Sequence, residues 1–340
     1  MTESGRRSAS ARPLLPQIFN GLRLPAIAAP MFLVSGPQLV IAQAKAGIIG
    51  SFPALNAKEA DGEPIALMAW LKEIDEALDR HNQAFPDRPA APFAVNLIVH
   101  RSNGRLERDL EICLRASVKI LITSLGAQPA VNQAAHGAGA IVLHDVINNT
   151  FARKAIEKGA DGLVAVAAGA GGHAGHQNPL ALLGEIRAWF DGPLMLSGAI
   201  ATGRSLLAAK VMGADLGYIG SPFIATQEAN AHPEYKAMIV NSSAEDIITS
   251  SSFSGVSGNY LRPSIVRAGL DPLNLEEGDT KRMNYGGGSS KPKAWSQIWG
   301  AGQGIGAVDA VVPVETLVAR LEHEYRAALL ESAALASAQS

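Results

Sequence analysis

The sequence predicts an α/β fold: a (β/α)8 TIM barrel that carries a long insertion after its eighth strand and ends in a C-terminal helix. Short apolar runs alternate with amphipathic segments along most of the 340 residues. These runs are apolar on both faces, as parallel strands covered by helices are. Eight of them can be counted, and eight strand–helix units close such a barrel.

The alternation of apolar runs and helical segments predicts a parallel sheet. An open, doubly wound sheet is the structural alternative. The Gly-x-Gly-x-x-Gly pattern that follows the first strand of a dinucleotide-binding fold is absent, which disfavours that form of the alternative. The expected strands are residues 25–30, 47–51, 92–98, 118–124, 139–144, 162–168, 193–198 and 215–220.

Signals at helix ends support this order of elements. Pro64 begins an amphipathic segment, and Asn178 with Pro179 supplies a cap and a first-turn proline for another helix. Thr202 caps a further helix, which Gly213 ends. Each of these helices is expected to lie between two barrel strands.

The barrel is expected to take up residues 14–224 together with the final helix, 313–335. Residues 225–312 form the insertion, which is interpreted as a lid that contributes part of the substrate pocket. A segment of this length rarely stays without secondary structure in a compact domain, so part of 225–250 should be helical. Residues 1–13 are expected to be disordered.

Composition excludes several classes of function. The net charge of −2, without a basic stripe, gives no reason to expect nucleic-acid binding. No run of about 18 apolar residues suggests a membrane span, and residues 1–13 lack the apolar core of a secretory signal. A cytoplasmic protein is therefore expected. The single cysteine, Cys113, allows no intrachain disulfide and is expected to pack in the core.

Two glycine motifs at consecutive strand ends are candidates for binding a phosphate. They are Ser197-Gly198-Ala199 after the seventh expected strand and Gly220-Ser221 after the eighth. Glycine allows backbone N–H groups to approach an anion closely, and in barrels the loops after these two strands often bind phosphate. The alternative is that the glycines only form tight turns.

The sixth expected strand ends at a glycine-dense loop that presents a histidine. Gly171 and Gly172 precede His173 there, in a loop that is expected to be mobile. A neutral imidazole can take a proton from a carbon acid or return one to it. The alternatives are a surface histidine without a role and a metal site shared with His176. No further ligands stand at suitable spacing, so no metal is expected.

Other strand ends and loops offer contacts to a ring system. Asn96 ends the third expected strand and could both donate to and accept from a polar ring edge, or could cap its own strand in an Asx turn. Ala29, Pro30 and Met31 form a small apolar patch after the first strand. Gln303 lies in a glycine-rich segment that is suited to covering a cofactor, or to serving as a hinge before the final helix.

Together these motifs resemble the nitronate monooxygenase family, also called 2-nitropropane dioxygenase-like proteins. This family of FMN-dependent barrels also includes FMN-dependent enoyl-ACP reductases. The resemblance spans most of residues 22–325. It rests on PAIAAPM (25–31), FAVNL (93–97), AGGHAG (170–175), SGAIATG (197–203), GADLGYIGSPFIATQEA (213–229) and AGQGIG (301–306).

The resemblance implies that FMN lies across the C-terminal mouth of the barrel. His173 would be the acid/base residue in the oxidation of an alkyl nitronate or nitroalkane by O2 to a carbonyl compound and nitrite. The phosphate would be bound by the backbone of Gly198, Ala199, Gly220 and Ser221, and the ring would be lined by Asn96 and by Ala29 to Met31. The other implied cofactor-binding residues are Gly171, Gly172, Ser197 and Gln303.

The chain departs from the family pattern at two places. Many members have glutamine where this chain has Ala28, and a Gln-Gly pair where it has Val166-Ala167. Both changes remove polar contacts to the flavin and leave the phosphate-binding residues intact. A second interpretation is therefore kept, an FMN-dependent NAD(P)H reductase of an enoyl thioester or quinone.

A third interpretation is a non-catalytic barrel that binds a phosphorylated ligand. The partners expected for the enzyme are a small-molecule substrate and O2, with neither nucleic acid nor membrane. A homodimer is left open.

Overall fold

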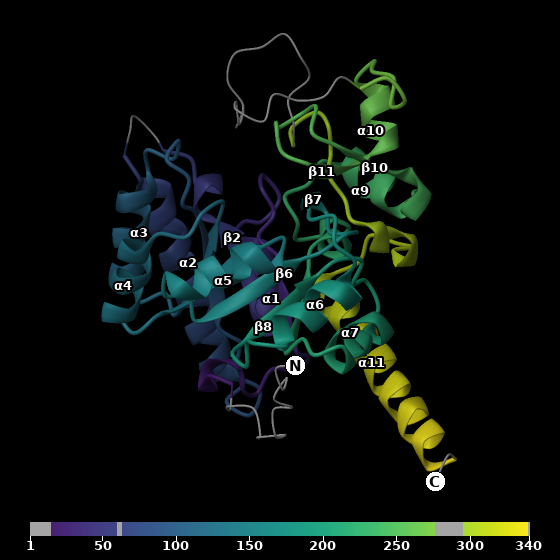
Figure 1. Cartoon of the computed structure of the whole chain (residues 1–340). Coiled ribbons are helices and arrows are strands. Elements are labelled where there is room, and N and C mark those ends of the chain that lie inside the picture. The colour runs from purple at the N-terminus through teal and green to yellow at the C-terminus, as the bar shows by residue number, and fades with distance from the viewer. Residues whose placement is uncertain (1–14, 60–62, 276–294, 339–340) are drawn as a thin grey trace, which may run out of the picture.

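A computed structural model describes residues 15–59, 63–275 and 295–338. Eight parallel strands form its central sheet in the order β1-β9-β8-β6-β5-β4-β3-β2 (Figure 1). They are β1 (Ala26–Ala28), β2 (Gly50–Pro53), β3 (Phe93–Ile98), β4 (Ile120–Ser124), β5 (Ile141–Val146), β6 (Gly162–Val166), β8 (Leu194–Ser197) and β9 (Leu216–Ile219).

The two edge strands of this sheet meet and close it into a barrel. Ile27 in β1 and Ile49, next to β2, form a parallel bridge. The Ala28 N–H donates to the Ile49 carbonyl at 2.8 Å. The predicted (β/α)8 barrel is therefore confirmed, and the open-sheet alternative is wrong. Each expected apolar run contributes one barrel strand, although β5 extends to Val146, beyond the expected end at His144.

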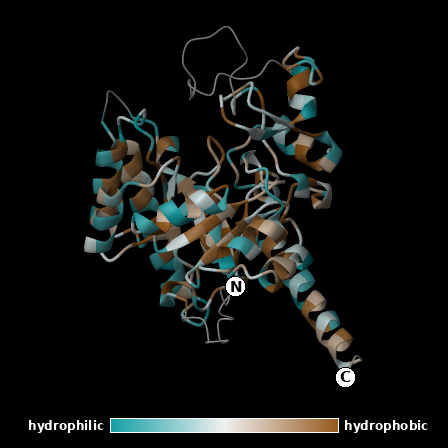
Figure 2. Cartoon of the chain, in the orientation of Figure 1, coloured by the Kyte–Doolittle hydropathy of each residue, from teal (hydrophilic) through white to brown (hydrophobic). Residues whose placement is uncertain are grey.

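Amphipathic helices cover the outside of the barrel, and Figure 2 shows them with both hydrophobic and hydrophilic faces. Thr202 caps α7 through a bond from the Ser205 N–H, and Asn178 caps α6, as the sequence predicts. Within the described ranges, no helix combines the length and apolar character needed to cross a membrane. The helices are α1 (Pro37–Lys45), α2 (Ile65–Ala84), α3 (Leu106–Arg115), α4 (Pro129–Gly137), α5 (Asn149–Glu157), α6 (Pro179–Arg187), α7 (Gly203–Val211) and α11 (Val314–Ser337).

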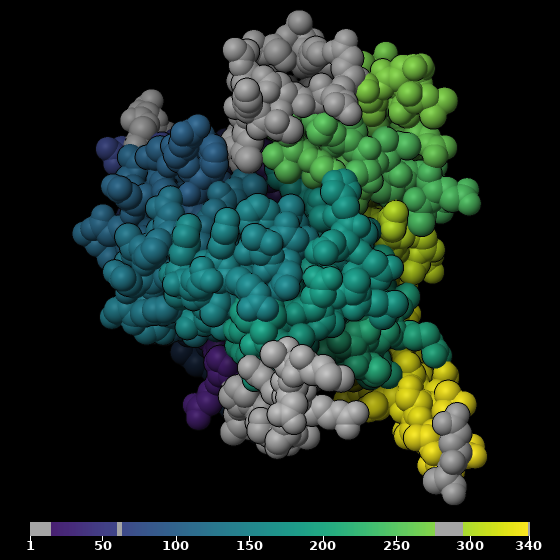
Figure 3. All heavy atoms as spheres, in the orientation of Figure 1, coloured from purple at the N-terminus to yellow at the C-terminus, as the bar shows by residue number. Residues whose placement is uncertain are grey.

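The insertion after β9 has its own secondary structure and lies at one end of the barrel (Figures 1 and 3). Strands β10 and β11 form a three-stranded antiparallel sheet with β7, which comes from the loop after β6. Helix α9 lies in the part expected to be helical. The remaining described elements, inside and outside the insertion, are β7 (Gly172–His173), α8 (Ser221–Ile224), α9 (Pro233–Val240), β10 (Ile247–Ser250), β11 (Gly258–Leu261), α10 (Arg262–Arg267) and the 3-10 helices Gln17–Phe19, Ala54–Asn56, Ala244–Asp246 and Gln303–Ala307.

The proposed boundary between barrel and insertion remains an interpretation, because the insertion shares a sheet with a barrel loop. The expectation for residues 1–13 falls outside the described residues. The same is true of residues 276–294 within the insertion.

The barrel interior is apolar up to the last layer of side chains. Alternate residues of a strand point to the same face, and inward positions such as Ile122, Leu143 and Val164 pack in one buried cluster. The next inward positions on β3, β4 and β5 are Asn96, Ser124 and Asp145, which are polar. Polar side chains therefore gather where the strands reach the C-terminal mouth.

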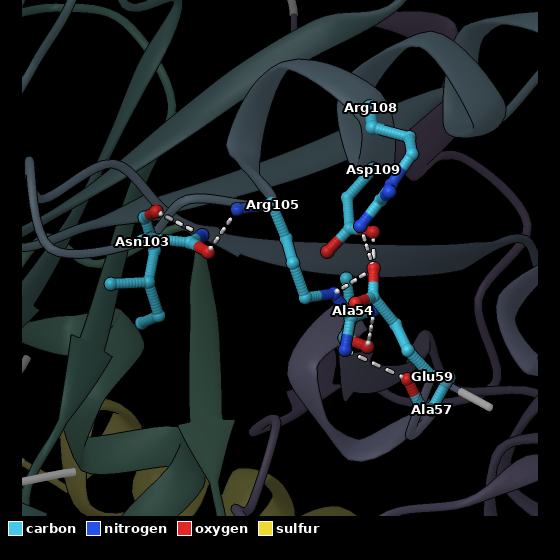
Figure 4. Close-up of polar contacts among 8 residues, drawn as sticks. Ala54, Ala57, Glu59, Asn103, Arg105, Arg108 and Asp109 are labelled. Atoms are coloured by element: carbon cyan, nitrogen blue, oxygen red, sulfur yellow. Dashed lines mark hydrogen bonds and ion pairs between the residues drawn. The ribbon is translucent and has the colours of Figure 1, made fainter. Parts of the chain in front are cut away.

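A partly buried ion-pair cluster braces two loops beside that mouth (Figure 4). The Arg105 guanidinium, at the start of α3, lies 3.1 Å from Asp109 Oδ1 and 3.2 Å from Glu59 Oε1. It also donates to the Ala57 carbonyl at 3.0 Å and the Ala54 carbonyl at 3.4 Å. Asp109 is fully buried, and burial raises the pKa of its carboxyl, against the opposing effect of Arg105.

Replacing Arg105 by methionine is expected to lower the free energy of unfolding by about 2 kcal/mol, because Asp109 would stay buried without its cation. Urea denaturation measures this. Arg115→Met is the matched control, because Arg115 pairs with Glu111 on the exposed side of the same helix and should change stability by less than about 0.5 kcal/mol. Equal losses in both variants would contradict the structural role of Arg105.

Candidate functional site

A cavity of about 1160 Å³ opens at the C-terminal ends of the barrel strands. The barrel loops form one side of it, and residues of the insertion form another. Twelve of the thirteen residues that the sequence singles out lie along its wall: Ala29, Pro30, Met31, Asn96, Gly171, Gly172, His173, Ser197, Gly198, Ala199, Gly220 and Ser221. Gln303 is the exception. Its side chain is exposed, and only its glycine neighbours reach the cavity.

His173 lies in a strand rather than in a mobile loop. It belongs to β7 and pairs with Gly258 of β11, so the insertion holds the histidine in place. Its imidazole meets the ring of Trp295 edge-to-face, with centroids 5.3 Å apart. Because the side chain is largely removed from water, the pKa of His173 is lowered to about 4. The free imidazole is therefore neutral at neutral pH.

Ser254 determines which nitrogen of His173 carries the proton. The Ser254 hydroxyl lies 2.9 Å from His173 Nε2 and 3.1 Å from the Val256 carbonyl, which can only accept. With the serine proton donated to Val256, the serine oxygen accepts from Nε2–H. Tyr260 OH, at 3.3 Å, can donate to the same oxygen. This network leaves Nδ1 as the basic atom. Sequence reasoning missed Ser254, which lies 81 residues from His173.

The glycine motifs after β8 and β9 form a shelf of exposed backbone. Gly198 has φ +151° and Ala199 has φ +53°, conformations that turn the chain sharply at the strand end. The Ala199 N–H already donates to the Gly169 carbonyl at 3.2 Å. Of the amides expected to bind a phosphate, those of Gly198, Gly220 and Ser221 are the better placed.

The loop of Gln303 packs directly against the histidine loop. The Gln303 N–H donates to the Gly169 carbonyl at 2.9 Å, and the Gly302 N–H donates to Ser221 Oγ at 2.8 Å. A Cβ on Gly302 would stand 2.6 Å from the Gly169 oxygen. The loop closes one side of the cavity through its backbone, and it fixes the Ser221 hydroxyl at the shelf.

The floor of the cavity carries a hydrogen-bonded chain across three strands. Asn96 donates both amide hydrogens, to the Ile122 carbonyl at 3.0 Å and to Ser124 Oγ at 2.8 Å. Ser124 donates in turn to Asp145 Oδ2 at 2.6 Å. Asn96 therefore has only its oxygen left for a ligand, whereas the sequence suggested that it could also donate.

Sequence reasoning missed Asp145 and Tyr218 in this layer. Burial raises the pKa of Asp145 to about 6, while the bond from Ser124 opposes the shift. Burial also raises the pKa of Tyr218, and the nearby Asp145 adds to that increase. The sequence signal that could have revealed Asp145 was a polar residue at an inward-facing position of an otherwise apolar strand. The strand was expected to end at His144, one residue earlier.

His176 also lines the cavity. It is exposed, and no three His, Cys, Asp or Glu side chains among the described residues come together as a metal site would require. Tyr260 is fully buried and contacts the Ser254 hydroxyl.

Comparison with known proteins identifies the family. The chain is 25% identical to the nitronate monooxygenase of Paraburkholderia phytofirmans, over 93% of this chain and 95% of that protein. It is also 25% identical to a Rhodococcus jostii protein named (3aS,4S,5R,7aS)-5-hydroxy-7a-methyl-1-oxo-octahydro-1H-indene-4-carboxyl-CoA dehydrogenase, over 73% of this chain and 65% of that one.

The fold is shared with the nitroalkane oxidase of Streptomyces ansochromogenes. That structure superposes with a TM-score of 0.75 at 22% identity and covers 93% of this chain and 99% of its own. The model of the nitronate monooxygenase family matches residues 15–324, nearly the whole described structure. The chain therefore belongs to the nitronate monooxygenase family and is an enzyme of the flavin oxidoreductase type.

Proposed function

We propose that this enzyme binds FMN and oxidises alkyl nitronates with O2 to a carbonyl compound and nitrite, with His173 as the acid/base residue. The observation that carries the proposal is the position of His173. A neutral imidazole, held by β11 and Ser254, shares one cavity with a glycine shelf on β8 and β9. A cofactor phosphate and a reacting carbon can both be accommodated in such a cavity.

The residues present fit FMN. A Cβ on Gly198 would lie 2.9 Å from the Ala168 carbonyl, so only glycine leaves this backbone close to a bound anion. The cavity volume of about 1160 Å³ exceeds the usual range for one ligand, about 300–1,000 Å³. It can therefore hold a cofactor together with a substrate. When bound, the flavin supplies the electron transfer between substrate and O2.

The protein's own residues orient the substrate and control one proton. Nδ1 of His173 is the free basic atom, and Ser254 holds the ring through Nε2. Trp295 packs on the imidazole and limits the access of water. A base with so low a pKa removes a proton from an unactivated carbon only weakly. A nitronate is already an anion, so it needs no such step and would instead stabilise the protonated imidazole.

The low pKa of His173 predicts the pH profile. The free imidazole takes up a proton only as the pH falls toward about 4, and the bound nitronate anion favours the protonated form, so kcat/KM for freshly prepared ethyl nitronate should rise as the pH falls from 8 to about 5. At pH 7 the enzyme should act much faster on ethyl nitronate than on nitroethane. Initial-rate assays across pH measure both. A rise that already levels off near pH 6.5 would show that His173 is not held in the buried environment described.

The proposed reaction is tested by anaerobic mixing. The purified, FMN-loaded enzyme is combined with ethyl nitronate in one experiment and with NADH or NADPH in another. The proposal expects rapid bleaching of the oxidised-flavin band by the nitronate alone. Bleaching by the nicotinamide alone would contradict it.

A second candidate is favoured by the size of the cavity. The space remaining beside FMN suits a substrate larger than a small nitronate, and the cavity wall includes Lys154 on α5 and Lys158 directly after that helix. The Rhodococcus jostii relative is named as a dehydrogenase of a CoA thioester. An FMN-dependent oxidoreductase of an acyl or enoyl thioester would use the same His173 and the same shelf. Bleaching by NAD(P)H followed by reoxidation with an enoyl thioester would support it.

A further inference from the structure

The floor of the cavity contains two polar groups that the protein leaves unsatisfied. Among the described residues, Asp145 Oδ1 and the Tyr218 hydroxyl are buried and have no hydrogen-bond partner. Both residues line the cavity, Asp145 from β5 and Tyr218 from β9. Burying a polar group without a hydrogen-bond partner is destabilising, so such a pair is expected where a ligand completes the bonding.

The surrounding structure fixes the direction of the Asp145 carboxyl. Ser124 donates to Oδ2 at 2.6 Å, and Asn96 donates to Ser124 at 2.8 Å, so the three side chains form one chain along the floor. Nothing in it supplies a donor to Oδ1. With the free oxygen of Asn96, the floor offers acceptors, and the hydroxyl of Tyr218 adds a donor.

Asp145 Oδ1 as an acceptor and the Tyr218 hydroxyl as a donor match the N–H and one neighbouring carbonyl of a cyclic imide. This arrangement is unsuitable for an anion, because the Asp145 carboxylate would repel one. The phosphate shelf on β8 and β9 has the opposite character, since it offers backbone N–H groups. The two ends of the cavity are therefore chemically distinct.

We propose that Asp145, positioned by Ser124 and flanked by Tyr218, binds the imide N–H of the cofactor's pyrimidine ring, N3–H in FMN. The inference rests on the proposed FMN function and adds the orientation of the cofactor. The pyrimidine edge points to the ends of β3, β4 and β5, and the phosphate points to the ends of β8 and β9. Asp145 is a binding residue in this account, and His173 remains the acid/base residue.

The test compares FMN with N3-methyl-FMN, which lacks the imide donor, by fluorescence titration of the apoprotein. The wild type should bind N3-methyl-FMN at least about 10-fold more weakly, because a hydrogen bond to a charged acceptor is lost. Asp145→Asn presents an N–H where the carboxylate oxygen stood. It should bind FMN about 10-fold more weakly and discriminate little between the two flavins. Tyr218→Phe should show a smaller loss of FMN affinity.

Thr123→Val is the matched control. Thr123 precedes Ser124 on β4 but points to the opposite face, where its hydroxyl bonds His144 Nδ1 at 2.6 Å. This variant should lose stability and keep the preference for FMN. The thermal stability of apo Asp145→Asn should equal or exceed that of the wild type, because a neutral amide replaces a buried carboxylate charge.

The outcomes separate this inference from the proposed function. If the wild type binds FMN and N3-methyl-FMN equally, or if Asp145→Asn keeps the preference, the imide site is wrong while FMN binding stands. If the wild type binds neither flavin, the proposed function fails and the imide site fails with it.

Discussion

Replacing His173 by asparagine is expected to lower the rate of nitronate oxidation by about 10²-fold or more, while FMN stays bound. Asparagine keeps a polar side chain beside Ser254 but cannot take up a proton. The His173 side chain packs on Trp295 and bonds Ser254, neither of which belongs to the glycine shelf, so the affinity for FMN should change little. Steady-state kinetics and a flavin titration measure the two quantities separately.

His323→Asn is the control for this variant, because His323 is exposed on α11 and should leave both quantities unchanged. Full turnover in His173→Asn would remove the acid/base role from this residue. A parallel loss of FMN would instead mean that His173 supports the cofactor rather than the reaction.

Replacing Gly198 by alanine is expected to weaken FMN binding by about 100-fold. The residue has φ +151°, which strains any side chain, and a Cβ would stand 2.9 Å from the Ala168 carbonyl. The strand end must shift, and with it the backbone that is proposed to bind the phosphate. Titration with FMN and with riboflavin measures the effect, and the loss should be much smaller for riboflavin because it carries no phosphate.

Gly184→Ala is the matched control. This glycine lies within α6, with open space where a Cβ would be added, so alanine should raise stability slightly. Its FMN affinity should match that of the wild type. Equal weakening of FMN and riboflavin in Gly198→Ala would indicate general damage to the site and would contradict a phosphate contact at this position.

The barrel could be predicted because its signals are local. Apolar runs, caps such as Thr202 and chain-reversing glycines each depend on a few neighbouring residues, and their order along the chain determines the parallel sheet. Strand β7 has no such signal. Two residues, Gly172 and His173, become a strand only because Gly258 and Asn259 pair with them, and a contact over that sequence distance leaves no periodic pattern.

The site residues that lie in or beside the glycine motifs could be predicted from the sequence, whereas several of the other site residues could not. His173 and the shelf residues line the same cavity because strand ends of a barrel converge at one mouth. Gln303 shows the limit of the approach, because its loop closes the cavity through backbone contacts while Gln303 itself is exposed and is not among the residues that line the cavity. Asp145 was missed because the end of β5 extends past the last residue of its apolar run.

A crystal structure of the protein with FMN bound would test the central claim most directly. The account predicts the phosphate against the backbone of Gly198, Gly220 and Ser221, and the flavin ring in the cavity beside His173. A phosphate bound elsewhere with this backbone empty, or a ring remote from His173, would contradict it.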